Sequence, residues 1–118
     1  MKPGLQALGR LKTGEMNKTE RAYSQRLELL LRAGEILWYR FEAIKLRLAD
    51  NCFLTVDFAV MDKNNMLELH DVKGSPYLFT DDAKVKMKVA ASQFPLVFKV
   101  VFPVAKKLGG GWHVEEIK

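Results

Sequence analysis

Two stretches of the chain carry apolar residues at helical spacing. In the first, residues 18–33, the apolar face consists of Ala22, Tyr23, Leu27, Leu30 and Leu31. Asn17 or Thr19 is suited to cap the beginning of this helix, and Gly34 is suited to end it. The second stretch, residues 81–93, follows Thr80 as a capping residue and ends before Pro95. The sequence therefore predicts two helices, over 18–33 and 81–93.

The remaining apolar segments have the short, alternating or continuous patterns of strands. Residues 36–48 predict a strand or a pair of strands, and residues 53–61 predict one strand that Asp57 interrupts. Residues 66–72 predict its hairpin partner, because the turn 62–65 holds one Asp and two Asn residues, which tolerate positive φ. The continuous apolar run 96–102 predicts a buried central strand, and residues 112–117 predict a short closing strand.

The predicted element order is α-β-β-β-α-β, followed by the closing strand. Three consecutive strands are expected to pair antiparallel, and the strand after the second helix is expected to join them in parallel through a right-handed crossover. We therefore expect one α/β (α+β) domain over residues 17–118, in which helices flank a mixed central sheet. Residues 1–16 show no clear periodicity and are expected to form a flexible arm.

Charge is distributed unevenly along the 118 residues. Residues 49–80 hold five acids and two lysines, whereas residues 1–48 hold ten Lys/Arg and residues 81–118 hold seven lysines. The net charge of +5 and this acidic centre between basic arms favour an anionic partner such as nucleic acid. The single Cys52 excludes an intramolecular disulfide, and no segment reaches 18 apolar residues, so a cytoplasmic protein without membrane residence is expected.

Candidate chemistry is concentrated in the predicted hairpin. Pairing of the two strands places Asp57 opposite a residue near 70–72, so Asp57 and Asp71 are expected at the same end of the sheet. Lys73 lies two residues beyond Asp71 and therefore points to the same face. Two neighbouring carboxylates repel each other unless a proton or cation lies between them, and Mg²⁺ prefers oxygen ligands. The backbone carbonyl of Val72 is a further candidate ligand.

An acid on one strand and Asp-x-Lys on the next, within this element order, resembles the PD-(D/E)XK nuclease superfamily. The residues that carry the resemblance are Asn17–Tyr23 at the start of the first helix, Arg32–Ile36, Val56–Asp57 and His70–Gly74. It implies a restriction-endonuclease-like core in which Glu20, Asp57 and Asp71 bind Mg²⁺, with Mn²⁺ as a substitute, and in which Lys73 is catalytic. Small phage nucleases related to the endonuclease I type of Holliday-junction resolvase have a similar plan.

The activity that the resemblance implies is Mg²⁺-dependent endodeoxyribonuclease cleavage, leaving 5′-phosphate and 3′-hydroxyl ends. A branched DNA intermediate of phage recombination or processing is the expected substrate, and its two-fold symmetry favours a homodimer. The residues expected to contact DNA are Arg21, Lys84, Lys86 and Lys88. Because Lys84 and Lys88 are four residues apart, they share a helix face that Lys86 does not share.

Simpler interpretations of the same residues remain open. Asp57 is alternatively a solvent-facing acid at a strand end. The pair of Asp71 and Lys73 is alternatively a surface ion pair. Glu20 is alternatively an acid that stabilises the first turn of the helix through the helix dipole. His70 points away from Asp71 and is expected to be a core or surface residue. At the level of the protein, the alternatives are a non-catalytic nucleic-acid-binding module on the same fold and a basic phage structural or interaction protein.

Overall fold

Residues 14–118 are described by a computed structural model, and residues 1–13 lie outside the described part, as does most of the arm expected over 1–16. The described residues of that segment contact the domain. The backbone N–H of Gly14 donates to Glu42 Oε1 at 2.9 Å. Met16 packs against the buried cluster that includes Tyr23.

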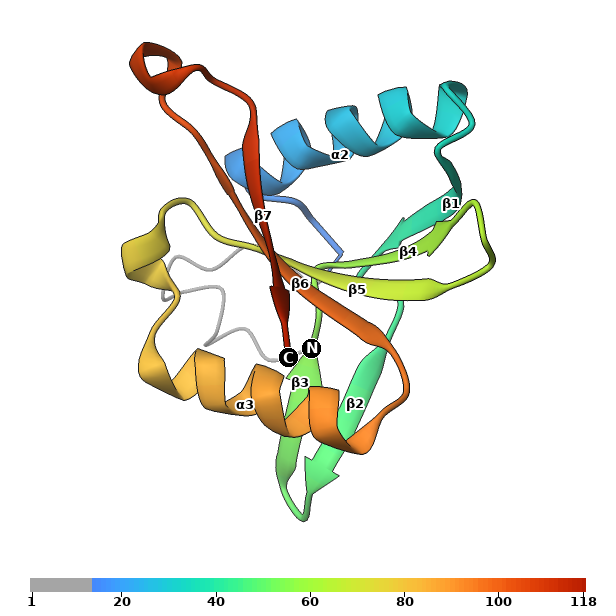
Figure 1. Cartoon of the computed structure of the whole chain (residues 1–118). Coiled ribbons are helices and arrows are strands. Elements are labelled where there is room, and N and C mark those ends of the chain that lie inside the picture. Colours follow the sequence, from blue (N-terminus) through green and yellow to red (C-terminus); the bar gives the residue numbers. More distant parts are fainter. Residues whose placement is uncertain (1–13) are drawn as a thin grey trace.

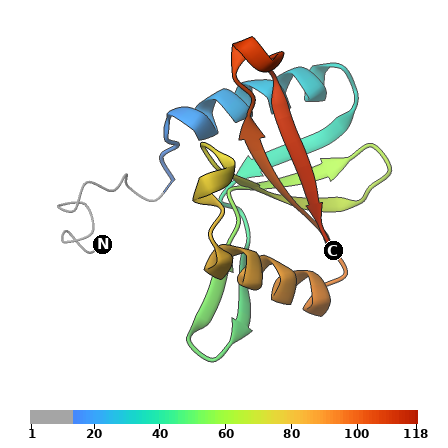
Figure 2. The same cartoon turned by 60° about the vertical axis from the view of Figure 1, so that its left-hand side comes forward.

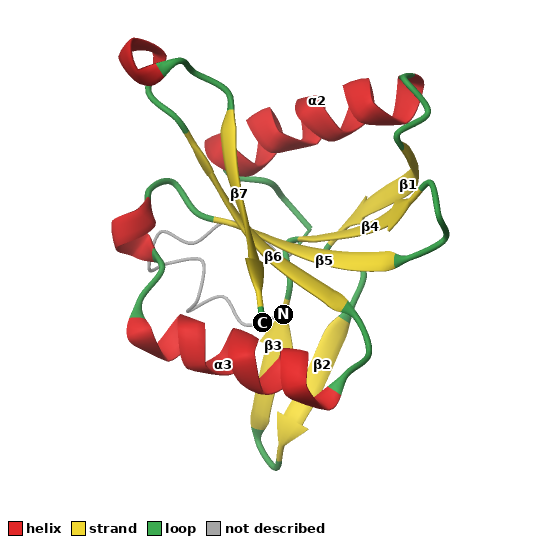
Figure 3. Cartoon of the chain, viewed as in Figure 1, coloured by secondary structure: helices red, strands yellow, loops and turns green. Residues whose placement is uncertain are grey.

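A five-stranded mixed sheet forms the centre of the structure, with one helix on each face (Figures 1 and 3). Its strands, in spatial order, are β1 (Ile36–Phe41), β4 (Phe58–Asp62), β5 (Leu67–Val72), β6 (Val97–Pro103) and β7 (Trp112–Ile117). Only β5 and β6 pair in parallel, and the crossover between them contains helix α3 (Asp81–Gln93). With helix α2 (Lys18–Arg32), the order α2-β1-β4-β5-α3-β6 confirms the expected α+β architecture with a mixed sheet.

A second, two-stranded sheet was not anticipated as a separate unit. It consists of β2 (Lys45–Ala49) and β3 (Cys52–Thr55), which form a hairpin between β1 and β4. The prediction of one continuous strand over 53–61 is wrong, because the chain breaks at Val56 and Asp57. In one strand, Val56 and Phe58 would face the same side. Here both are buried, but Val56 belongs to the core beneath α3 and Phe58 to the core beneath α2.

Local sequence signals define the ends of both helices. Asn17 caps α2 in a capping box, because its side chain accepts from Glu20 N–H at 2.8 Å while Glu20 Oε1 accepts from Asn17 N–H at 2.9 Å. At the other end, Gly34 has φ +77°, and the N–H groups of Gly34 and Glu35 donate to the carbonyls of Leu31 and Leu30. This is a Schellman motif, which requires the left-handed conformation at Gly34.

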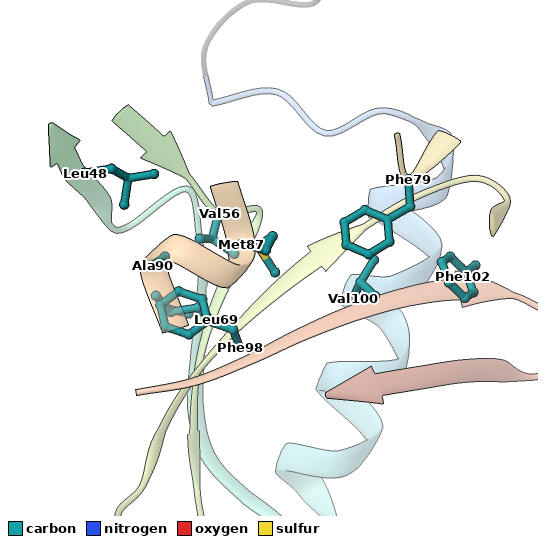
Figure 4. Close-up of a cluster of buried hydrophobic side chains, with 10 residues drawn as sticks. Leu48, Val56, Leu69, Phe79, Met87, Ala90, Phe98, Val100 and Phe102 are labelled. Atoms are coloured by element: carbon teal, nitrogen blue, oxygen red, sulfur yellow. The ribbon is translucent and has the colours of Figure 1, made fainter. Parts of the chain in front are cut away.

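The two faces of the sheet bury two distinct hydrophobic clusters. The α3 side contains Leu69, Met87, Ala90 and Phe98 with neighbours from β2 to β6 (Figure 4). The α2 side contains Tyr23, Leu27, Phe58, Val60, Val72 and Val101. Because strand residues alternate between faces, β5 directs Leu69 and Asp71 toward α3, and His70 and Val72 toward α2. Asp71 and His70 therefore lie on opposite faces, as expected.

A hairpin formed by the ends of β6 and β7 extends beyond the sheet. It carries the short 3₁₀ helix η2 (Lys106–Leu108) at its tip, which Figure 1 shows beyond the edge of the sheet, while Trp112 at the start of β7 packs against Tyr23 of α2. A second 3₁₀ helix, η1 (Pro76–Leu78), lies between β5 and α3. Both 3₁₀ helices lie toward the end of the sheet where β5 terminates.

Candidate metal and phosphodiester site

The register of the sheet brings Asp57 and Asp71 to one end of neighbouring strands. Phe58 pairs with His70, so Asp57 lies one step outside β4, opposite Asp71. Asp57 Oδ2 accepts a hydrogen bond of 2.7 Å from the backbone N–H of Val72. The side chain of Asp57 thus occupies the place that the next residue of β4 would take in the ladder. The strand break at Val56 and Asp57 is what turns this carboxylate toward β5.

Asp71 and Lys73 form a close pair on the α3 face of β5. Lys73 Nζ lies 3.2 Å from Asp71 Oδ2, and the side chain of Asp71 is only 12% exposed. The backbone of Lys73 continues the ladder, since its N–H donates to Val101 carbonyl at 2.9 Å. Lys73 is thereby held beside the carboxylates, although β5 itself ends at Val72.

Glu20 reaches the same region from α2. It is the third residue of the helix, and the capping box fixes one of its carboxylate oxygens. The carboxyl of Glu20 also lies within hydrogen-bonding reach of Asp57, where it raises the pKa of Asp57. The alternative of a purely helix-stabilising acid therefore accounts for only one of the two contacts that this side chain makes.

The electrostatics of the site centre on Asp57. Burial, most of all, and the negative charges of Asp71 and Glu20 together raise the pKa of Asp57 to about 9, against the opposing effect of the Val72 N–H. At neutral pH the carboxyl of Asp57 consequently keeps a proton, which the contact with Glu20 accommodates. An acid whose pKa is raised by burial and by neighbouring acids is typical of functional sites.

The donor set has the chemistry of a Mg²⁺ site. The carboxyl groups of Asp71 and Glu20 both lie near enough to Asp57 to raise its pKa, and a cation would replace the proton of Asp57 as the partner of their negative charges. The Val72 carbonyl points to the same side as its N–H, toward Asp57, because both groups of an extended residue face one neighbour. In residues 14–118, however, no group of three His, Cys, Asp or Glu residues has its donor atoms already converged on one point. The residues fit Mg²⁺ in kind, and Asp57 must lose its proton to bind it.

The four residues expected to contact DNA are not gathered on one surface. Arg21 lies beside Glu20 and donates to the carbonyl of Met16 at 3.2 Å. Lys84 and Lys88 share a groove with Glu115 and Glu116 of β7, so acids offset their charge there. Lys86 points away from them, toward β3, where its Nζ donates to the Phe53 carbonyl at 3.3 Å. The expected division of these lysines between two helix faces is confirmed.

A buried polar network on the α2 face was not anticipated. His70 Nε2 and Lys99 Nζ both donate to Glu68 Oε1, at 2.8 and 2.9 Å. These contacts lower the pKa of Glu68, and burial raises the pKa of Tyr23, whose hydroxyl keeps its proton and donates to His70 Nδ1 at 2.7 Å. The alternation of Glu68 and His70 along β5 was the available signal, but it did not reveal their partners from α2 and β6.

Comparison with protein-family models, with curated proteins and with solved structures finds no match to this chain. Membership of the PD-(D/E)XK superfamily therefore stays a prediction that the residues themselves must support. In the described part of the chain, no helix has the length and apolar composition needed to cross a membrane.

Proposed function

We propose that this protein is a Mg²⁺-dependent endodeoxyribonuclease of the PD-(D/E)XK type. The observation that carries the proposal is the buried Asp57 opposite Asp71 at the end of β5, with Glu20 near enough to help raise the pKa of Asp57 to about 9. Mutual repulsion of buried acids opposes folding. A surface ion pair or a helix cap does not require acids to lie so close together, whereas a site for a divalent cation does require neighbouring acids.

Each residue has a role that its position supports. Asp57, Asp71, Glu20 and the Val72 carbonyl would hold Mg²⁺. The chemistry that Mg²⁺ supplies when bound is polarisation of the scissile phosphate and a lowered pKa of an attacking water. Lys73, which lies 3.2 Å from Asp71, would stabilise negative charge that develops on the phosphate and orient the water. In-line attack would leave 5′-phosphate and 3′-hydroxyl ends.

We further propose branched DNA as the substrate, a homodimer as the active form, and the host cytoplasm of a phage as the setting. The basic residues of the chain, which give it a net charge of +5, support a polyanionic substrate. The choice of a four-way junction is an analogy, which rests on the resemblance to the phage resolvases.

The partners that the three acids already have favour a non-catalytic DNA-binding module as the second candidate. Asp71 is already paired with Lys73, and Glu20 is engaged in the capping box. Asp57 keeps a proton, which relieves the repulsion between the acids in the absence of a cation. Such a module would bind DNA in a salt-sensitive way, with or without Mg²⁺, and would never cleave it.

A substrate panel distinguishes these two functions. The purified protein is incubated with linear duplex, single-stranded and four-way-junction DNA, in Mg²⁺, in Mn²⁺ and in EDTA. The nuclease predicts cleavage in either metal, none in EDTA, and a preference for the junction. The matched variants are Asp57→Asn, which should be inactive, and Asp50→Asn, which neutralises an exposed acid elsewhere and should cleave normally. Binding without cleavage under every condition would establish the module instead.

A further inference from the structure

The β6–β7 hairpin leaves the sheet beside the carboxylates. The last pair that β6 makes with β5 joins Val101 to Val72, next to Asp71. Beyond it, β6 and β7 pair only with each other, through Phe102 with His113 and Pro103 with Trp112. The segment from Phe102 to His113, here called the arm, therefore begins at the candidate site and projects away from it (Figures 1 and 2).

A mainly apolar groove of about 530 Å³ lies along the arm. Its volume falls within the range of about 300–1,000 Å³ found for small-molecule sites. The residues that line most of it are Pro76, Phe102, Pro103, Val104, Leu108 and His113. The exposed His113 ring stacks on the buried Phe102 ring, with centroids 5.4 Å apart and an interplanar angle of 2°, so one flat face of His113 stays open. Pro76 belongs to η1, which follows Lys73 closely, so one wall of the groove comes from the chain that leaves the candidate site.

The surroundings of the groove combine exposed apolar side chains with positive charge. Tyr77, which follows Pro76 in η1, is 93% exposed, and Leu108 is 73% exposed. Lys106 and Lys107 at the tip are exposed, and no ion pair to either is found within residues 14–118. A single acid, Glu115, lies among the lining residues.

This combination suits one occupant, an unpaired stretch of single-stranded DNA. Bases of such a strand stack on aromatic and apolar side chains, and its phosphates interact with lysines. A duplex presents stacked bases that an apolar groove cannot reach. A protein partner would match the apolar lining, but it would not explain two exposed lysines or the position of the groove beside a phosphodiester site.

We propose that the arm and η1 form a binding groove for single-stranded DNA, which receives an unpaired strand next to the cleavage site. This inference rests on the proposed nuclease function and specifies its substrate as DNA with unpaired nucleotides at or near the scissile bond. The exposed face of the His113 ring, whose other face stacks on the buried Phe102, receives a base. Lys106 and Lys107 contact the phosphates on either side of it.

The test is DNA binding in EDTA, where cleavage cannot occur, measured by fluorescence anisotropy with a single-stranded overhang and with a blunt duplex. Loss of one stacked base is expected to weaken binding of His113→Ala to the overhang by roughly 5- to 100-fold, with binding to the duplex unchanged. His113→Phe keeps an aromatic ring and should bind the overhang as the wild type does. Because His113 is exposed on an edge strand, both variants should fold, and their melting temperatures check this.

The lysines are tested through the salt dependence of binding. The double variant Lys106→Ala/Lys107→Ala should reduce the slope of log K against log salt by about 1.4, since each contact with a single strand contributes about 0.7. The control Arg47→Ala/Lys63→Ala removes two charges that are paired with Asp50 and Glu35 elsewhere on the surface, and it should leave the slope unchanged.

The outcomes separate this inference from the nuclease function. If the wild type binds and cleaves DNA while the His113 and lysine variants bind the overhang normally, the groove is not a DNA site and the nuclease stands. If the wild type binds neither the overhang nor the blunt duplex, both the groove and the nuclease function are contradicted.

Discussion

Asp57 is the residue on which the site depends. Its carboxylate is held by the Val72 N–H, yet it is buried beside two other acids, so its pKa is raised to about 9. An acid whose pKa is higher in the folded protein makes the folded state bind a proton more tightly than the unfolded chain does. The free energy of unfolding therefore falls as pH rises from the ordinary pKa of 3.8 to about 9, by at most ~1.4 kcal/mol per pH unit.

Asp57→Asn should remove this pH dependence. Asparagine is isosteric with the protonated acid: its carbonyl accepts from Val72 N–H and its amide donates to Glu20. We expect equal stability of variant and wild type near pH 4 and a stability advantage of the variant that grows toward pH 9, together with loss of cleavage by more than about 100-fold.

Urea unfolding of both proteins at several pH values, without metal, measures the stability difference. A variant that loses stability at every pH would show that Asp57 is an ordinary ionised strand-end acid.

Glu20 has two explanations that one substitution separates. Glu20→Gln keeps an oxygen that accepts from Asn17 N–H, so the capping box survives, but it removes the charge beside Asp57. We expect an unchanged melting temperature and a cleavage rate lowered by roughly 10-fold or more. Full cleavage activity in this variant would limit Glu20 to its role in the helix cap.

At the scale of elements, the sequence predicts what local chemistry determines. Helix α3 begins and ends as expected, because Thr80 caps it and Phe94 leaves the helical conformation before Pro95. The Schellman motif at Gly34 is equally local. The break at Val56 and Asp57 is not local: apolar residues continue on both sides of Asp57, and only the presence of two separate cores shows that Val56 and Phe58 must face opposite sides.

The contact between α2 and β5 depends on the buried hydrogen bond of Tyr23 with His70. Tyr23→Phe leaves His70 Nδ1 without its donor in a site where both residues are at most 5% exposed. We expect a loss of about 1–3 kcal/mol in the free energy of unfolding.

Tyr39→Phe is the matched control, because it removes a hydrogen bond to Glu28, whose side chain is 39% exposed, so that water can replace the lost donor. Its destabilisation should be clearly smaller, as measured by urea unfolding. Equal losses in the two variants would show that the buried network contributes nothing particular.

At the scale of the whole molecule, the sequence predicted which residues meet but not how they are partnered. The hairpin register sufficed to place Asp57 opposite Asp71, and the two-residue spacing placed Lys73 beside Asp71. The contact of Glu20 with Asp57 and the network of Glu68 with Lys99 join elements that are distant in the chain. No periodicity encodes such contacts, because they follow from how the helices pack on the sheet.

The proposed substrate makes a prediction about assembly. A four-way junction is two-fold symmetric and offers two equivalent strands, so the active form should be a homodimer. Sedimentation equilibrium at micromolar concentration should give twice the 13.5 kDa mass of the chain. A monomer that cleaves junctions at full rate under the same conditions would contradict this.

The Mg²⁺ site is tested most sharply by DNA cleavage with the wild type and with Asp71→Ala, side by side, in Mg²⁺ and in EDTA. Circular dichroism confirms beforehand that the variant is folded. We expect cutting by the wild type in Mg²⁺ only, and a rate at least about 100-fold lower in the variant. Equal cutting by the folded variant, or cutting by the wild type in EDTA, would contradict a Mg²⁺ site built on Asp71.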